Sequence, residues 1–274
     1  MAKFKKKLSR VLIYLILILI SMISIFPCYW MLASAFNSTE QIVAGRILPS
    51  THLFENIRNL FATYPIAQGL WNSVKIAVIT VVASLLVTSL AAYGFEKFRS
   101  RNSERVYNLI LIGMMVPFSA LVVPLYKTMA AVGLTNSHWA IILPAIGSIF
   151  LLFFFRQSFK SIPNELLEAA RIDGASELRI FFQIVFPSMR ATYAAAAIYA
   201  FMTSWNNYMW PMVVLNAPSK KTIILHVSKI ITSGYYPDYG VQMAGLVIAT
   251  LPIALFFLLL QRSFVEGITG SVKG

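Results

Sequence analysis

The chain has 274 residues, of which 58% are hydrophobic and only 12% are charged, and its mean hydropathy is +0.72. A soluble domain of this length could not cover its surface with so few charges, so the composition excludes one and indicates a polytopic membrane protein. The net charge of +13 is read as a signal of membrane orientation, not of nucleic-acid binding. A single cysteine, Cys28, excludes an intramolecular disulfide and a cysteine metal site.

Five bases precede the first apolar block, namely Lys3, Lys5, Lys6, Lys7 and Arg10. A cleaved signal peptide is the competing interpretation, since Ala33-Ser34-Ala35 resembles a cleavage site. However, the uncharged run is well beyond the roughly 7–15 residues of a signal-peptide core. We therefore expect an uncleaved first helix that runs outward from a cytoplasmic basic segment.

Six uncharged apolar blocks are each long enough to cross a bilayer of roughly 30 Å, which takes about 20 helical residues. They lie near Val11–Phe36, Ile76–Phe95, Val106–Leu125, Trp139–Phe155, Ala191–Leu215 and Val241–Gln261. The fold predicted is an all-α polytopic membrane protein with about six transmembrane helices, in a single domain over residues 1–274. Most of the 23 lysines and arginines then fall on the cytoplasmic side, together with both termini. This orientation places Lys220, Lys221 and Lys229 outside, which does not fit the positive-inside rule.

The loop from Asn37 to Asn72 is long enough to form a small external structure.

Prolines inside membrane helices break backbone hydrogen bonds, so Pro117, Pro124 and Pro144 predict helix kinks or a helix face that lines a cavity. The alternative is that these prolines serve only the packing geometry of the helices.

A loop at about residues 157–188 is the only long segment of the second half that mixes acids and bases. Pro163 is tolerated in a first helical turn, and Gly174 suits the left-handed position that ends a helix. Ser176 can cap a second helix, with Glu177 favourably placed at its N-terminus. The pattern predicts a helix–turn–helix at the cytoplasmic membrane face, between the fourth and the fifth transmembrane helix.

The first helix of this loop has an apolar stripe of Leu166, Leu167, Ala169 and Ala170. Glu165, Glu168 and Arg171 follow one another along its edge at i, i+3 spacing. The helix therefore lies either on lipid or against a protein partner, because amphipathicity alone does not choose between them.

A dense polar and aromatic run interrupts the fifth block, from Thr203 through Ser204, Trp205, Asn206 and Asn207 to Tyr208. Polar side chains in hydrocarbon need partners or water, so Ser204, Asn206, Asn207 and Tyr208 are candidates for a substrate path. Hydrogen bonding between helices, with an aromatic belt at the interface, is the alternative.

The sequence lacks the residue patterns expected of ATP binding, metal binding, catalysis and ion-coupled transport. It has no G-x-x-x-x-G-K-[ST] phosphate loop, and His52, His138 and His226 are scattered without metal-ligand spacing. No catalytic site can be assembled from it, so an enzyme is not expected. An ion-coupled transporter would keep ionisable groups well inside its spans, and the six blocks have none.

The loop also resembles a known family. Glu168-Ala169-Ala170, Asp173-Gly174-Ala175, Ile184 and Pro187 resemble the EAA loop of binding-protein-dependent ABC importer permeases, with Phe186 where that family usually has Leu. The resemblance extends to Asn72–Ala77, to Ala91–Phe95, to the S-W-N run of the fifth block and to the ending Leu251–Gly274. It is nearest to the maltose-type second permease.

This resemblance implies one permease subunit of an ABC importer for a sugar or short oligosaccharide, in the cytoplasmic (inner) membrane of a bacterium. It implies Glu168, Ala169, Ala170, Asp173 and Gly174 as the residues that couple the chain to its ATPase. The implied partners are a second permease, an ABC ATPase dimer and an extracytoplasmic sugar-binding protein, with ATP bound by the ATPase and no cofactor or metal on this chain. A stand-alone carrier or channel is the alternative.

Overall fold

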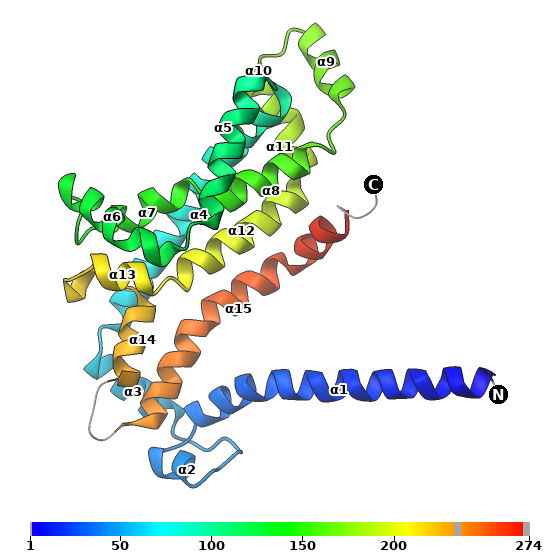
Figure 1. Cartoon of the computed structure of the whole chain (residues 1–274). Coiled ribbons are helices and arrows are strands. Elements are labelled where there is room, and N and C mark those ends of the chain that lie inside the picture. Colours follow the sequence, from blue (N-terminus) through cyan, green and yellow to red (C-terminus); the bar gives the residue numbers. More distant parts are fainter. Residues whose placement is uncertain (1, 233–236, 271–274) are drawn as a thin grey trace. The chain divides into compact units, whose positions relative to one another are not determined.

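The structure is a computed structural model that describes residues 2–232 and 237–270. It is helical, without strands in this part of the chain (Figure 1). The chain divides into two compact units, Met1–Ile66 with Val227–Leu251 and Ala67–His226 with Pro252–Gly274, here called the first and the second unit. Each unit is described by itself, and the single domain over residues 1–274 stays a prediction.

The first unit begins with the long helix α1 (Ala2–Ala35), followed by α2 (Thr39–Val43) and α3 (Leu53–Thr63). The buried Asn56 side chain donates from Nδ2 to the carbonyls of Ala35 (2.9 Å) and Asn37 (3.0 Å), which satisfies backbone acceptors at the end of α1. A Cβ at position 240 would lie 2.6 Å from Asn56 Oδ1, so Gly240 permits the close approach of α15 (Tyr239–Gly270). The loop from Asn37 to Asn72 is thus folded, as the sequence predicts.

The second unit contains most of the helices. They are α4 (Ile66–Lys97), α5 (Arg101–Ile112), η1 (Gly113–Met115), α6 (Phe118–Ala131), α7 (Trp139–Ile146), α8 (Ile149–Phe159), α9 (Asn164–Ile172), α10 (Glu177–Ile180), η2 (Phe181–Val185), α11 (Phe186–Ser188), α12 (Arg190–Trp205), α13 (Met209–Val214) and η3 (Pro218–Lys220). Helix α14 (Ile223–Thr232) and helix α15 contribute to both units.

Four described helical segments are long and apolar enough to cross a membrane: Arg10–Ala35, Ile66–Lys97, Trp139–Phe159 and Tyr239–Gln261. A fifth span arises if Arg101–Met115 and Phe118–Ala131, which meet at 107°, count as one. Pro117 stands at this bend as the N-cap of α6, where its missing N–H cannot continue the helix before it. Pro144 lies inside α7, two residues before that helix ends at Ile146.

The fifth apolar block differs most from the expected single helix. It is divided into α12 and the short α13, separated at residues 206–208. Neither helix is long enough to count as a span alone, so the structure supports four to five spans, and the count of six stays a prediction.

The core of the second unit contains a cluster of aromatic side chains from α4, α8, η2 and α12. The rings of Tyr93 and Phe181 lie 5.5 Å apart, and those of Phe155 and Tyr193 lie 4.7 Å apart. Leu167 of α9 is buried in the same cluster. This packing holds the helix–turn–helix against the longer helices of the second unit.

Candidate functional site

The predicted helix–turn–helix is present as α9, a turn at Gly174 and α10 (Figure 1). Gly174 has a φ of +80°, and its N–H donates to the carbonyl of Arg171 at 3.0 Å. The N–H of Ala175 donates to the carbonyl of Ala170, also at 3.0 Å. These two bonds form a Schellman motif, which needs a left-handed residue at the glycine position. Ser176 caps α10 as predicted, its Oγ accepting from the N–H of Arg179 at 3.4 Å.

The apolar stripe expected on α9 is divided between two faces. Leu167 is only 1% exposed and Ala170 packs against the aromatic core, whereas Leu166 is 47% exposed and Ile172 is 86% exposed. Neighbouring helical residues are turned by about 100° from each other, and the aromatic core covers the side of α9 that carries Leu167 but not the side that carries Leu166. One face therefore anchors α9 to its own chain, and the other presents apolar side chains outward.

Of the five predicted coupling residues, four are exposed: Glu168, Ala169, Asp173 and Gly174. Glu168 forms no hydrogen bond or ion pair within the described part of the chain. It lines an open cleft of about 590 Å³ together with Lys97, Lys160, Glu165 and Arg171. Ala170, the fifth, is half-buried on the anchoring face.

An ion pair across the turn links α9 to α10. Arg171 donates from Nε to Glu177 Oε1 at 2.6 Å, and the hydroxyl of Tyr93 donates to Glu177 Oε2 at 2.8 Å. The hydrogen bond from Arg171 lowers the pKa of the Glu177 carboxyl, and the same bond raises the pKa of Arg171. The pair thus fixes α9, α10 and α4 relative to one another on the two sides of Gly174.

A buried ion cluster, which the sequence analysis did not identify, joins α4, α5 and α8. Arg156, with a side chain 6% exposed, donates from Nε to Glu96 Oε2 at 3.2 Å and from Nη2 to Glu104. Its guanidinium lies 3.9 Å from the ring centre of Tyr107, and Arg99 completes the cluster by pairing with Glu96. The sequence signal that could have indicated this cluster is the placement of opposite charges at the ends of successive apolar blocks.

Lys97 connects this region to the start of α9. Its Nζ donates to the carbonyl of Ile162 at 2.9 Å and to Asn164 Oδ1 at 3.0 Å. The carbonyl of Ile162 lies just before α9, and Asn164 is its first residue. Both ends of α9 are therefore fixed by side chains that come from, or pair with, residues of α4.

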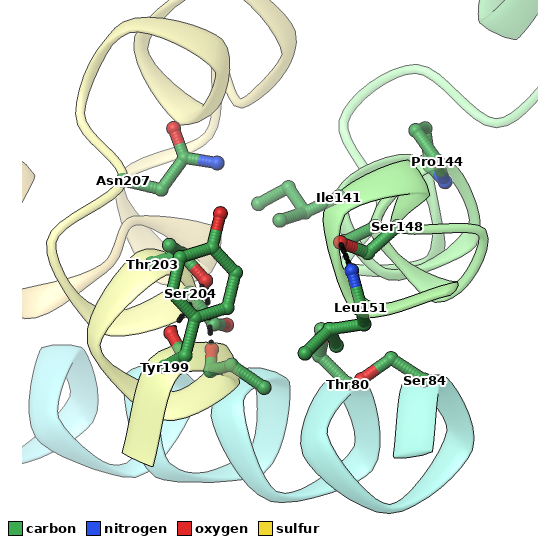
Figure 2. A pocket seen from close by; sticks show the side chains of 12 residues that line it. Thr80, Ser84, Ile141, Pro144, Ser148, Leu151, Tyr199, Thr203, Ser204 and Asn207 are labelled. Atoms are coloured by element: carbon green, nitrogen blue, oxygen red, sulfur yellow. Dashed lines mark hydrogen bonds between the residues drawn. The ribbon is translucent and has the colours of Figure 1, made fainter. Parts of the chain in front are cut away.

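A second candidate site is a cavity of about 230 Å³ in the second unit, here called the polar cavity (Figure 2). Figure 2 shows Asn207, Ser204, Thr203 and Tyr199 facing Ile141 and Ser148 across it. The full lining is Thr80, Ser84, Ile141, Pro144, Ala145, Ser148, Leu151, Tyr199, Ala200, Thr203, Ser204 and Asn207.

The polar cavity includes only part of the predicted substrate path. Ser204 and Asn207 line it, whereas Asn206 and Tyr208 do not. Thr80, Ser84 and Ser148, which the sequence analysis did not single out, contribute hydroxyls. No group of three or more His, Cys, Asp or Glu side chains in the described residues could hold a metal ion.

Comparisons with known proteins give consistent results over nearly the whole chain. The lactose transport system permease protein LacG of Rhizobium radiobacter is 48% identical over 273 residues, covering 100% of both chains. The arabinooligosaccharides transport system permease protein AraQ of Halalkalibacterium halodurans is 36% identical, covering 98% of this chain and 100% of its own.

The fold is shared with a solved structure. A chain in the crystal structure of a bacterial ABC transporter involved in the import of the acidic polysaccharide alginate aligns with a TM-score of 0.86. The alignment covers 95% of this chain and 98% of that one at 22% identity, so it supports the fold alone. The chain therefore has the fold of an ABC importer permease.

A family model, described as the inner membrane component of binding-protein-dependent transport systems, matches residues 84–270. This range includes the helix–turn–helix and eleven of the twelve residues around the polar cavity. Together with the full-length relatives, the match shows that the chain is a transport permease and not an enzyme. The chain belongs to the family of inner membrane components of binding-protein-dependent transport systems.

Proposed function

We propose that this chain is one permease subunit of an ABC importer that moves a sugar or short oligosaccharide across the bacterial inner membrane. Support for the sugar class comes from the full-length identity with the lactose and arabinooligosaccharide permeases. The partners in this proposal are a second permease, an ABC ATPase dimer and an extracytoplasmic sugar-binding protein. ATP is bound by the ATPase, and this chain carries no cofactor.

The proposed topology has six spans with both termini in the cytoplasm. The bent pair α5–α6 provides one span, and α12 with α13 provides another, which brings the four long helices to six. The basic N-terminal segment and the bases around α9 support this orientation. Helix α9 then lies in the cytoplasm between the fourth and the fifth span.

We propose α9 as the helix that couples this permease to its ATPase. The observation that carries this assignment is its pair of faces, one anchored by the buried Leu167 and the other presenting Leu166, Ala169, Ile172 and the unpaired Glu168. A lipid-facing helix would more naturally surround its apolar face with lysines. The small Ala169 permits close approach, and Glu168 can pair with a base in a groove of the ATPase.

The proposed substrate path runs past Ser204, near the end of α12, and past Asn206, Asn207 and Tyr208 in the break between α12 and α13. Irregular backbone at membrane depth is tolerated where it lines a cavity or is buried in protein. The break at these residues, next to the polar cavity, supports this placement.

Co-purification of the ATPase with the permease pair tests the coupling assignment. Removing one partner of a desolvated charge pair costs about 2–5 kcal/mol, and about 1.4 kcal/mol is tenfold in affinity. Glu168→Lys should therefore release the ATPase in a pull-down. Glu55→Lys, which changes the charge of an exposed acid on α3 of the first unit, is the matched control and should retain it. Normal retention by Glu168→Lys would refute the assignment.

A further inference from the structure

The polar cavity lies where two helices are interrupted. Helix α7 ends at Ile146 and α8 begins at Ile149, while α12 ends at Trp205 and α13 begins at Met209. Ser148 in the first break and Asn207 in the second both line the cavity, with α4 forming a third wall. Interrupted helices are tolerated in a membrane where protein or a water-filled cavity satisfies the freed backbone groups. The two breaks thus place polar groups around one cavity.

Two hydroxyls of this cavity have no hydrogen-bond partner in the described chain. They are Thr80 Oγ1 and Ser204 Oγ, and both atoms are inaccessible to solvent. Thr80 as a residue is only 3% exposed, and it lines the cavity from α4. A buried polar group without a partner is unfavourable, so a small rotation of either side chain toward a polar occupant of the cavity would be favourable.

Two other hydroxyls of the cavity already make one hydrogen bond each, which determines whether they can still donate or accept. Thr203 Oγ1 donates to the carbonyl of Tyr199 at 2.9 Å, so its lone pairs face a group that donates. Ser148 Oγ accepts from the N–H of Leu151 at 3.3 Å, so its O–H can donate. An occupant must therefore both donate and accept, as an alcohol does.

No charged side chain lines the polar cavity. An anionic occupant would bring a charge into a site that offers no compensating cation, which is strongly unfavourable once the site is desolvated. The lining also has apolar walls in Ile141, Pro144 and Leu151, which suit the C–H face of a sugar ring. A lining that offers hydroxyl groups, an apolar wall and no charge suits one uncharged pyranose or furanose ring.

We infer that the polar cavity is a subsite of this permease chain for one uncharged sugar ring, which the hydroxyls of Thr80 and Ser204 and the amide of Asn207 bind, and which rejects anionic sugars. This inference rests on the proposed sugar importer. It adds the location of a sugar-binding subsite and a selectivity for uncharged sugars. A cavity that holds only ordered water is the alternative outcome of the tests.

The first test uses cysteine protection in the assembled transporter. With Cys28→Ser as background, Asn207→Cys places a thiol in the cavity lining, and Met202→Cys places one at an exposed position of α12 that neither lines the cavity nor belongs to the proposed substrate path. Methyl β-galactoside should slow labelling by a thiol reagent at least threefold at position 207 and leave position 202 unchanged. The corresponding galacturonoside should protect neither. Absence of protection at position 207, or equal protection by both sugars, overturns the inference.

The second test removes hydroxyls without changing shape. The double variant Thr80→Val, Ser204→Ala should lower lactose uptake by the reconstituted transporter at least tenfold while the complex stays assembled. Thr88→Val is the matched control, because this buried α4 hydroxyl bonds to the carbonyl of Ser84 and does not line the cavity. Normal uptake by the double variant refutes the subsite but leaves the sugar importer standing. A wild-type complex that imports no sugar, neutral or acidic, refutes both.

Discussion

Gly174 is the residue at which backbone geometry bears most directly on the proposed coupling. Its φ of +80° closes the Schellman motif that ends α9, and a Cβ there would meet no atom within 4 Å. A substitution is therefore penalised by backbone strain and not by a clash. For a β-branched residue this strain is of order 1–3 kcal/mol, enough to redirect α9 without removing any of its side chains.

Gly174→Val should keep the ATPase bound but separate ATP hydrolysis from sugar uptake. Gly174→Asn is the control, because asparagine tolerates the left-handed region, and it should retain most of the coupled activity. The measurement is the ratio of sugar imported to ATP hydrolysed in proteoliposomes. Equal ratios for the valine variant and the wild type would show that the geometry of this turn does not matter for coupling.

The ion pair between Arg171 and Glu177 makes the turn sensitive to acid. The pKa of Glu177 is lowered from its ordinary value of 4.5, so its stabilisation is present above pH 4.5 and is lost as the pH falls through the lowered value. Amide exchange in residues 171–180, corrected for the intrinsic rate, should therefore accelerate below pH 4.5. In Glu177→Gln this acceleration should disappear. A wild-type acid profile in that variant would assign it to another group.

At the scale of elements, the buried ion cluster fixes the ends of α4, α5 and α8 to one another. Arg156→Met should lower the free energy of unfolding by about 3 kcal/mol, the lower end for breaking a buried pair, because Arg99 still neutralises Glu96. Arg99→Met should cost about 1 kcal/mol or less, since the Arg99 side chain is 51% exposed. Thermal unfolding in detergent compares the two variants. Equal midpoints would mean that burial gives Arg156 no special role.

The elements that the sequence predicted well are those defined by local chemistry. Gly174 and Ser176 specify the turn and the cap of α10, and Pro117 specifies the bend before α6, because backbone restrictions at one residue suffice. The apolar blocks also located most of the long helices, because a membrane-spanning helix needs about 20 consecutive apolar residues. The sequence predicted one continuous helix through Trp205, because a continuous apolar run does not show where a helix is interrupted.

The sites were predictable only in part, because they depend on contacts between distant segments. Arg156 and Glu96 belong to different helices, and their pairing follows from packing that no local pattern encodes. Thr80 joins Ser204 in one cavity for the same reason. On α9, the sequence supplied the residues of the apolar stripe, but the aromatic core determines that Leu167 is buried and Leu166 is exposed.

At the scale of the whole molecule, the proposed topology makes a direct prediction about sidedness. Reporter fusions after Ser50, Ser137 and Pro218 should report the outside of the membrane, and fusions after Arg101 and Gly174 the cytoplasm. The lysines at 220, 221 and 229 make the Pro218 fusion the most demanding of these. A Gly174 fusion that reports the outside would overturn the orientation and, with it, the access of α9 to a cytoplasmic ATPase.

The most direct test of the central claim is sugar uptake by the reconstituted complex. The permease pair, the ATPase and the binding protein are placed in proteoliposomes, and the import of a labelled sugar that the binding protein binds is followed with and without ATP inside. We predict uptake that requires ATP hydrolysis, the binding protein and the ATPase, and that stops in Glu168→Lys. Uptake by the permease chains alone, driven by an ion or sugar gradient and unaffected by Glu168→Lys, would contradict this account.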